Sequence, residues 1–210
     1  PAADRADNLV YDGLIRLQDG PADPSIVIIA IDDRSLNALG RWPWTRTVHA
    51  ALIDRLTQAQ PRAVAYDVLF TEPEADDAAL AAALARARDV HLPLLVEAPG
   101  QNGAAWQVSE PASDLARAAA SLGHVNMIVD GDGVIRRVPL YMQAGAHSWP
   151  QLVLPLAETA GVAPPAPRPD ADSGEALIAA SPEAIAYRGP PGRFPVSYTH
   201  LRAHETLRYL

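Results

Sequence analysis

With 210 residues, of which 49% are hydrophobic and 20% charged, the chain has the size and composition of one globular domain with a hydrophobic core, which excludes global disorder. Its formal net charge of -8 opposes binding to the phosphates of nucleic acids. The absence of cysteine excludes disulfides, thiolate metal sites and cysteine nucleophiles, and it is compatible with both the cytosol and the cell envelope.

No segment of the chain reads as a membrane span or a signal peptide. The longest apolar runs, IVIIAI and AALAAALA, are far shorter than the roughly 18 apolar residues of a membrane helix. The first residues, PAADRADN, contain neither a methionine nor a charged segment followed by an apolar one. We therefore expect the sequence to be a piece of a longer protein.

Strands and helices alternate through the first half of the chain. Helices are predicted where apolar residues recur at helical spacing, and strands where β-branched residues run together. The run SIVIIAID is the clearest strand, and its continuous hydrophobicity is typical of a strand buried on both faces. The predicted elements are a helix over 8–18, a strand over 25–32, a helix over 45–60, a strand over 63–70, a helix over 76–88 and a strand over 90–97.

The second half adds an antiparallel hairpin. Residues 124–143, HVNMIVDGDGVIRRVPLYMQ, read as two strands around a DGDG turn, because glycine takes the positive φ of a tight hairpin. The other predicted elements are a helix over 111–123 that stops at Gly123, a helix over 148–161 that Pro155 interrupts, a Pro-rich loop over 162–175 and a closing strand pair over 176–189. The alternation favours right-handed crossovers, so we predict an α/β fold with a mostly parallel sheet flanked by helices and an added antiparallel hairpin.

Three carboxylates are the first candidates for a binding site. Asp32 and Asp33 stand at the carboxyl end of the first predicted strand, where open α/β sheets bind ligands. Asp67 lies in the second strand, on the face opposite its apolar residues if the alternation holds. If the two strands are neighbours, the three carboxylates could converge on Mg²⁺, a hard cation that prefers oxygen ligands.

A structural role for these acids is the stronger interpretation. The chain has no Gly-rich phosphate loop, no lysine and no nucleophile with an orienting base. Carboxylates at strand ends also cap helices and pair with arginines. We therefore expect no catalytic residue, no metal and no cofactor, and we keep Asp32, Asp33 and Asp67 as ligand-binding candidates.

The segment GRWPWTR offers an aromatic site. Trp42 and Trp44 can stack on a planar ligand while a neighbouring arginine binds its carboxylate. Packing is the stronger alternative, because tryptophan buries a large apolar area and the intervening proline stiffens the turn. In that case Arg46, near the start of a helix, can return to Asp32 or Asp67 as an ion pair.

The histidines give no legible site. His200 and His204 are four residues apart, as in a metal-binding helix, but no third ligand is visible. They belong to PVSYTHLRAHETLRYL, which resembles a translated sequencing adapter, so residues 195–210 are predicted to be a non-native or disordered tail. His124 and Asn126 are expected to be hydrogen-bonded edge residues of the hairpin.

Several segments occur in an order that resembles one known family. They are IVIIAIDDRSLNALGRWPWTRTVHAALIDRL, AVAYDVLF, GHVNMIVDGDGVIRRVPL and IAYRGPPGRF, of which GRWPWTR and DGDGVIRR are the most specific parts. In this order they resemble the class-two CHASE domain, an extracellular sensory module, over roughly residues 8–194. The matching motif positions, to which the family assigns no roles, are Asp32, Ser35, Gly40, Trp42, Pro43, Trp44, Arg46, His49, Asp67 and Phe70.

The resemblance implies a sensor on the extracytoplasmic (periplasmic) face of the membrane, usually preceded by one membrane helix and followed by several. Such a sensor feeds an output domain such as a nucleotide cyclase, diguanylate cyclase or histidine kinase, and it is not itself an enzyme. The implied partners are an unknown small molecule or envelope signal and the C-terminal membrane and output domains of the parent chain. A homodimer is also expected, and nucleic acid is not.

We accordingly predict an entry segment with a helix over 1–24, a single sensory domain over 25–194 and the tail over 195–210. The ligand-binding candidates are Asp32, Asp33, Ser35, Trp42, Trp44, Arg46 and Asp67. One alternative is a Mg-dependent hydrolase or phosphoacceptor domain that uses Asp32, Asp33 and Asp67. Another is a structural or protein-interaction module that responds to a partner protein.

Overall fold

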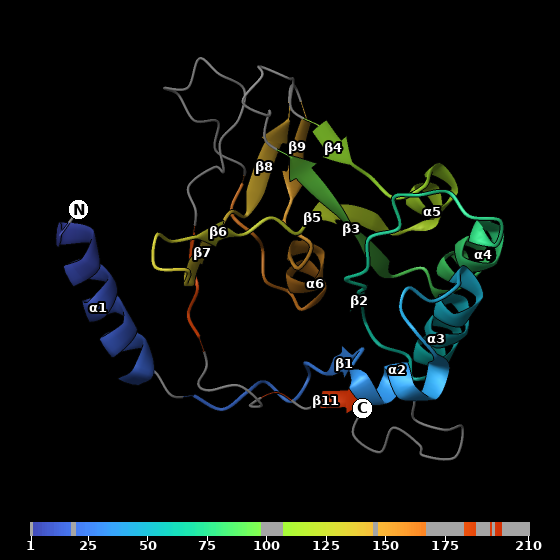
Figure 1. Cartoon of the computed structure of the whole chain (residues 1–210), viewed down its shortest axis with the longest axis horizontal. Coiled ribbons are helices and arrows are strands. Elements are labelled where there is room, and N and C mark those ends of the chain that lie inside the picture. Colours follow the sequence, from blue (N-terminus) through green and yellow to red (C-terminus); the bar gives the residue numbers. More distant parts are fainter. Residues whose placement is uncertain are drawn as a thin grey trace. The chain divides into compact units, whose positions relative to one another are not determined.

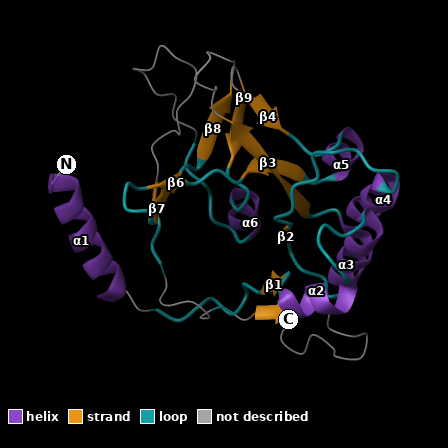
Figure 2. Ribbon diagram, viewed as in Figure 1, coloured by secondary structure: helices purple, strands orange, loops and turns teal. Residues whose placement is uncertain are grey.

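The computed structural model describes residues 2–17, 20–97, 107–144, 147–166, 183–187, 194 and 196–198. Its contacts divide the chain into two compact units, Pro1–Pro43 with Ile185–Leu210, and Trp44–Ala184. Figures 1 and 2 show the elements of both units. None of the described helices combines the length and the hydrophobicity that a membrane span requires.

The described part of the smaller unit contains two helices and a pair of parallel strands. The elements are α1 (Ala2–Leu17), β1 (Ile28–Ala30), α2 (Asp33–Leu39) and β11 (Val196–Tyr198). β1 pairs with β11 in a register that sets Ile28 against Val196. The Tyr11 hydroxyl of α1 donates a hydrogen bond of 2.6 Å to the Ile185 carbonyl oxygen. The predicted entry helix is therefore present, and three residues of the predicted tail form a strand.

The first strand differs from the prediction of a strand buried on both faces. The regular strand is only three residues long, and Ile28 keeps 45% of its surface exposed. Ile26 and Ile31, on either side of it, are also exposed. A strand is buried on both faces only where sheet neighbours and helices cover it, and the strand partner of β1 among the described residues is β11 alone. The apolar run predicted the strand correctly and its burial wrongly.

The larger unit is built around one central strand, β3. Its first elements are α3 (Arg46–Gln58), β2 (Val64–Ala65), α4 (Asp77–Ala87), β3 (Val90–Glu97), β4 (Gln107–Ser109), α5 (Ser113–Ala118) and β5 (Ser121–His124). β2 and β5 run parallel to β3, and β4 pairs antiparallel with its last three residues. Strands joined through α4 and α5 in this way confirm the predicted α/β fold.

Three helices cover this sheet and form the main core. In Figure 2, α3, α4 and α5 gather along one side of the sheet. Their apolar faces bury side chains that are at most 1% exposed, namely Ile53, Leu80, Ala83, Leu84 and Leu115, together with Phe70 and Leu92. Many of the α4 residues are alanines, which give strong helix propensity and let α3 and α5 pack closely on either side. This core supports the side chains of the candidate site.

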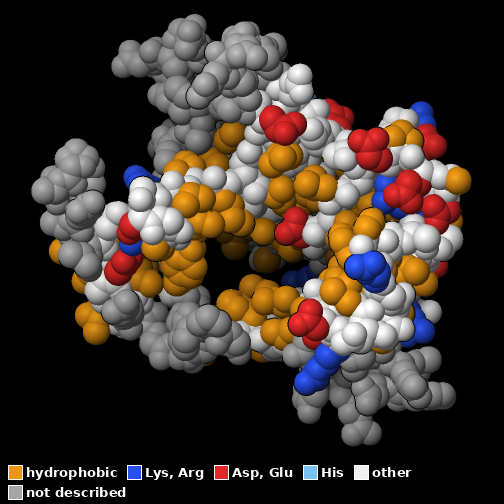
Figure 3. Space-filling view, viewed as in Figure 1, with side chains coloured by type: hydrophobic (Ala, Val, Ile, Leu, Met, Phe, Trp, Pro, Cys, Tyr) orange, Lys and Arg blue, Asp and Glu red, His pale blue; other side chains and the backbone are white. Residues whose placement is uncertain are grey.

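Short antiparallel pairs make up the rest of the larger unit. The elements are β6 (Ile128–Val129), β7 (Ile135–Val138), β8 (Tyr141–Ala144), β9 (His147–Pro150), α6 (Leu154–Thr159) and β10 (Glu183–Ala184). β6 and β7 form the predicted hairpin, β10 pairs with the other edge of β7, and β8 pairs with β9. Apolar side chains gather over the β6–β7 hairpin (Figure 3), where Met127, Val129 and Val134 are exposed.

Gly123 is not the helix stop that was predicted. Helix α5 already ends at Ala118, and Gly123 lies inside β5. A Cβ atom on Gly123 would lie 2.6 Å from the Leu152 Cα and 2.8 Å from its backbone nitrogen. The glycine is needed because another part of the backbone approaches it closely, not because the chain takes a positive φ there.

The predicted helix over 148–161 is also wrong before residue 154. Residues 148–150 belong to β9, and α6 begins at Leu154. Pro155 lies in the first turn of α6, where its missing N–H has no intrahelical partner to lose, so it starts the helix instead of interrupting it. In the Pro-rich loop, residues 162–166 form no regular element and 167–175 lie outside the described residues. Of the predicted closing pair, residues 183–187 are described: β10 covers 183–184 and pairs with β7, and 185–187 form no regular element.

Candidate functional site

Asp32 caps a helix. Its Oδ1 atom accepts hydrogen bonds from the Ser35 backbone nitrogen (2.9 Å) and from the Ser35 Oγ (2.8 Å). Asp32 has extended backbone geometry, as an N-cap residue does, and its carbonyl accepts the first helical bond, from Leu36. Ser35 is fully buried, while Asp33 in the first turn is exposed. The capping interpretation of Asp32 is therefore confirmed.

The chain passes from the smaller to the larger unit within the GRWPWTR segment, between Pro43 and Trp44. Gly40 ends α2 with φ of +101°, a conformation that favours glycine. The peptide bond between Trp42 and Pro43 is cis. Trp42 keeps 44% of its surface exposed, whereas Trp44 is 4% exposed. The two tryptophans therefore differ in burial, and Trp44 is the one packed in the interior.

Arg46 is the centre of a buried network. Its Nε donates to the Asp77 Oδ1 at 2.8 Å, and its Nη2 donates to the Glu72 carbonyl oxygen at 2.7 Å. Its Nη1 lies 3.2 Å from the Glu74 Oε1. The arginine thus ties the first turn of α3 to the first turn of α4 and to the loop before it. The predicted ion pair of Arg46 with Asp32 or Asp67 is wrong, because the partners are Asp77 and Glu74.

Aromatic rings surround this arginine. The guanidinium carbon lies 4.5 Å from the centre of the Phe70 ring, within cation–π range. The His49 ring packs edge-on against Phe70, 5.0 Å away, and contacts Trp44 at 6.0 Å. The His49 Nδ1 and the Tyr66 hydroxyl oxygen are 2.7 Å apart and share a hydrogen bond. We call Trp44, Arg46, His49, Tyr66, Phe70 and Asp77 the Arg46 cluster.

Burial sets the protonation states in the Arg46 cluster. It lowers the pKa of His49 to about 4, and the nearby Arg46 charge acts in the same direction. Burial also raises the pKa of Tyr66 well above its usual value. Both side chains are therefore neutral at pH 7, so the buried ion pair of Arg46 and Asp77 carries the charge of the cluster. Every group here has an internal partner, which is how structural networks are satisfied.

Asp67 lies just beyond β2 and points away from this cluster. Tyr66 and Phe70 are buried, while Asp67 and Leu69 are exposed, as the predicted alternation requires. In the parts of the chain that the structure describes, no group of three or more His, Asp or Glu side chains could hold a metal ion. The assignment of Asp33, Trp42 and Asp67 as ligand contacts stays a prediction.

A second buried arginine holds the DGDG turn together. The Arg136 Nη1 donates to the Asp130 Oδ2 (2.9 Å) and to the Asp132 Oδ1 (3.0 Å), and Arg137 donates to the Asp130 Oδ1 (2.9 Å). These donors lower the pKa of Asp130 and bring that of Asp132 to about 2. Gly133 takes φ of +81° and donates to the Asp130 carbonyl oxygen, which confirms a tight turn.

His124 and Asn126 lie alongside β3, and both were predicted to be hydrogen-bonded. The prediction is confirmed for Asn126 and wrong for the His124 side chain. The Asn126 side chain accepts from the Val96 nitrogen at 3.0 Å and donates to its carbonyl oxygen at 2.7 Å, so it continues the β5 ladder along β3. His124 is fully buried, and neither of its ring nitrogens has a hydrogen-bond partner in the described structure. Burial lowers its pKa to about 4. His200 and His204 lie outside the described residues.

Four members of the Arg46 cluster were not among the seven predicted site residues. His49 and Phe70 were named only as motif positions without a role, and Tyr66 and Asp77 were not singled out. One sequence feature could have indicated the Arg46–Asp77 pair. Arg46 begins α3 and Asp77 begins α4, and opposite charges at the starts of two neighbouring helices can reach each other. The contact itself depends on how α3 packs against α4.

Fold and site together define a small α/β domain whose most specific motif residues serve its internal packing. The chain belongs to the CHASE2 domain family, whose model matches residues 2–208. This is a family of extracellular sensory domains that occur in signalling proteins, which confirms the resemblance carried by the motifs. The comparisons with curated proteins and with solved structures gave no match.

Proposed function

We propose that the chain is the extracytoplasmic, periplasmic signal-input domain of a membrane-bound signal transduction protein, such as a nucleotide cyclase, a diguanylate cyclase or a histidine kinase. The observation that carries this proposal is the CHASE2 match over residues 2–208. Its activity is binding and not catalysis. The internally satisfied Arg46 cluster supports this view, because Arg46, His49 and Tyr66 are held by one another and by Asp77 instead of facing a substrate.

The signal is proposed to be a small molecule or an envelope component. Of the predicted ligand-binding residues, Asp33, Trp42 and Asp67 are exposed. Ser35, Trp44 and Arg46 are buried. Binding produces a signal only if it favours one of two conformations of the domain.

A second copy of the chain is the proposed partner of the entry helix. On α1, Val10, Leu14 and Leu17 are 63%, 56% and 82% exposed, and their spacing places them along one face. An exposed apolar stripe of this kind pairs with the same stripe of another copy in a helical dimer. Sedimentation at increasing concentration tests this: a chain that stays monomeric throughout contradicts the dimer and leaves the sensor proposal intact.

The reading frame around the chain tests the sensor proposal most directly. We expect an apolar span of about 20 residues shortly before residue 1 and several such spans after the domain, followed by an output domain. Flanking sequence without any span would contradict the membrane-bound sensor.

A magnesium titration separates the sensor from the hydrolase or phosphoacceptor alternative. A metal bound by Asp32, Asp33 and Asp67 must stabilise the folded chain by mass action, so the melting temperature would rise with MgCl₂. We expect no rise beyond that of an Asp67→Asn variant. A rise that this variant abolishes would favour the alternative.

A further inference from the structure

The buried side-chain nitrogens that lack a hydrogen-bond partner in the described structure gather where β5 meets β9. They are both ring nitrogens of His124 and the Nε1 atom of Trp149. His124 is paired with Leu94 across β5 and β3, so the two side chains project from the same face of the sheet. On that face Leu94 forms a small core with Val96 and Met142, and Trp149 packs against it. The unpartnered nitrogens therefore border one apolar cluster.

The same place joins β8, β9 and α6 to the central sheet. The Leu152 backbone nitrogen, just before α6, donates a hydrogen bond of 3.0 Å to the His124 carbonyl oxygen. Gly123 approaches Leu152 too closely for any side chain to fit between them. Met142 of β8 and Trp149 of β9 complete the contact through the small core. A change at the His124 ring therefore acts directly on the contact between β5 and these elements, which we call the β5–β9 junction.

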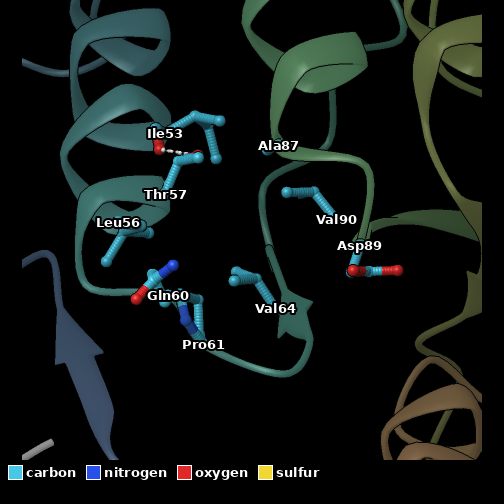
Figure 4. Close-up of a pocket in the computed structure, with 9 residues that line it drawn as sticks. All are labelled: Ile53, Leu56, Thr57, Gln60, Pro61, Val64, Ala87, Asp89 and Val90. Atoms are coloured by element: carbon cyan, nitrogen blue, oxygen red, sulfur yellow. Dashed lines mark hydrogen bonds between the residues drawn. The ribbon is translucent and has the colours of Figure 1, made fainter.

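The surroundings of His124 oppose a positive charge. Its ring is fully buried, and burial lowers its pKa to about 4. The Leu140 carbonyl oxygen acts in the opposite direction, but it already accepts a hydrogen bond of 2.8 Å from the Gln151 nitrogen. The pocket of about 100 Å³ in Figure 4 is lined by residues around the end of α3 and the starts of β2 and β3, so it does not reach the ring. A proton on His124 is therefore a buried charge without compensation.

Titratable side chains on the neighbouring elements are exposed or project from the other face of the sheet. They are His91 and Glu97 of β3, Tyr141 of β8, His147 of β9 and Glu158 of α6. His91 and Glu97 are each three positions from Leu94, and Tyr141 is next to Met142, so strand alternation turns all three away from His124. His147 and Glu158 are exposed, and Glu158 acts on the charge of His91. No neighbouring carboxylate offsets the burial of His124.

We infer that His124 is a pH-sensitive switch at the β5–β9 junction. Protonation of the ring separates β8, β9 and α6 from β5, because opening this contact lets water reach the charge. The core between α3, α4 and α5 stays folded, since its side chains form a separate cluster. The switch needs no ligand, so it goes beyond the proposed function and is independent of it.

Amide hydrogen exchange of the 210-residue chain, followed by NMR at pH 7 and pH 5, tests this switch. The reporter is the Leu152 amide, which bonds to the His124 carbonyl oxygen. Its protection factor is the intrinsic exchange rate at each pH divided by the measured rate. A ring whose pKa is about 4 in the closed junction and 6.5 in the open one makes opening about twentyfold more frequent at pH 5 than at pH 7. We expect the protection factor to fall by the same amount.

Two variants separate local opening from unfolding of the whole chain. His124→Met keeps an apolar side chain of similar volume without the ring nitrogens, so it should remove most of the twentyfold decrease at the Leu152 amide. His49→Gln is the matched control, because it removes a second buried histidine with a pKa of about 4, in the other core, and should leave the decrease unchanged.

Three results would each overturn the inference. The first is an unmodified chain whose Leu152 protection factor is the same at both pH values. The second is a decrease in His124→Met as large as in the unmodified chain. The third is a smaller decrease in His49→Gln, which would mean that the junction opens only when the whole chain unfolds. The first and third results need only chains that retain His124, so they decide the question even if the methionine variant does not fold.

Discussion

Two arginines of the larger unit are buried to the same extent and held in different ways. Arg46 and Arg136 are each 5% exposed. The carboxylate that binds Arg46 comes from Asp77, 31 residues away, and joins two helices. The carboxylates that bind Arg136 lie six and four residues before it, inside its own hairpin. The first network therefore stabilises tertiary packing, whereas the second stabilises a turn.

The acids differ in exposure as well as in distance along the chain. The Asp77 side chain is 9% exposed; of the two acids that bind Arg136, Asp130 is 6% exposed and Asp132 is 47% exposed. Water screens the exposed Asp132 and can replace its partner, and the buried Asp130 keeps Arg137 as a second partner, so losing Arg136 leaves neither carboxylate uncompensated. A buried arginine that loses its carboxylate has no such replacement and remains an uncompensated charge. The Arg46 cluster should therefore be the more fragile of the two.

Asp77→Ala should give the largest loss of stability. The substitution leaves the buried Arg46 guanidinium with the partly exposed Glu74 as its remaining carboxylate and the Glu72 carbonyl as its remaining acceptor, which predicts a decrease of about 3–5 kcal/mol in the free energy of unfolding. Urea denaturation followed by circular dichroism measures it. Asp54→Ala is the matched control, because the Asp54 pair with Arg86 is exposed on the same two helices and should cost less than about 1 kcal/mol. Equal losses in both variants would contradict the structural role of the Arg46 cluster.

Arg136→Met should be milder. The methionine keeps much of the buried aliphatic volume, and Asp130 retains Arg137 as a partner at 2.9 Å. We expect a loss of about 2 kcal/mol, measured by the same denaturation. Arg137→Met, at a side chain that is 50% exposed, should lose less. If Arg136→Met destabilises the chain more than Asp77→Ala, the ranking of the two networks is reversed.

This contrast also explains what the sequence could predict. The DGDGVIRR turn was predicted correctly because its acids, glycines and arginines act on one another within a few residues. The partner of Arg46 was predicted wrongly because Asp77 reaches it only after α3 and α4 have packed together. Apolar periodicity predicts that both helices exist, but it does not fix their rotation or their offset.

Gly123 and Pro155 show the same limit. Glycine at the end of an apolar helical pattern usually marks a helix stop, and proline within such a pattern usually marks a break. Here the close approach of Leu152 determines the role of Gly123, and the start of α6 determines that of Pro155. The predicted burial of β1 was wrong for a related reason, since an apolar run does not reveal how many strands and helices will cover it.

The two networks should also respond to different ranges of pH. The His49 pKa falls from 6.5 to about 4 in the folded chain, so its contribution to stability is complete above pH 6.5 and is lost as the pH falls toward 4. The loss amounts to at most about 1.4 kcal/mol per pH unit. The Asp132 pKa falls from 3.8 to about 2, so its contribution is present above pH 3.8 and is lost only in stronger acid.

Urea denaturation at a series of pH values separates these contributions. His49→Gln should flatten the stability profile between pH 6.5 and 4 without abolishing its slope, because the buried His124 titrates in the same range. Asp132→Asn should leave that range unchanged and flatten the profile below about pH 3.8. An unaltered slope in His49→Gln would mean that His49 is not held neutral by its surroundings.

Tyr66→Phe should have the smallest effect and tests the cluster at one atom. It removes only the hydroxyl that lies 2.7 Å from the His49 Nδ1, while the ring keeps its stacked contact with Phe70. The buried histidine nitrogen then has no partner at this position, which predicts a loss of about 1 kcal/mol. Tyr141→Phe is the control, since no hydrogen bond of the Tyr141 hydroxyl occurs in the described structure. A loss in Tyr66→Phe that the control does not share would show that the histidine and the tyrosine stabilise the Arg46 cluster through this bond, and equal effects would reduce their contact to packing alone.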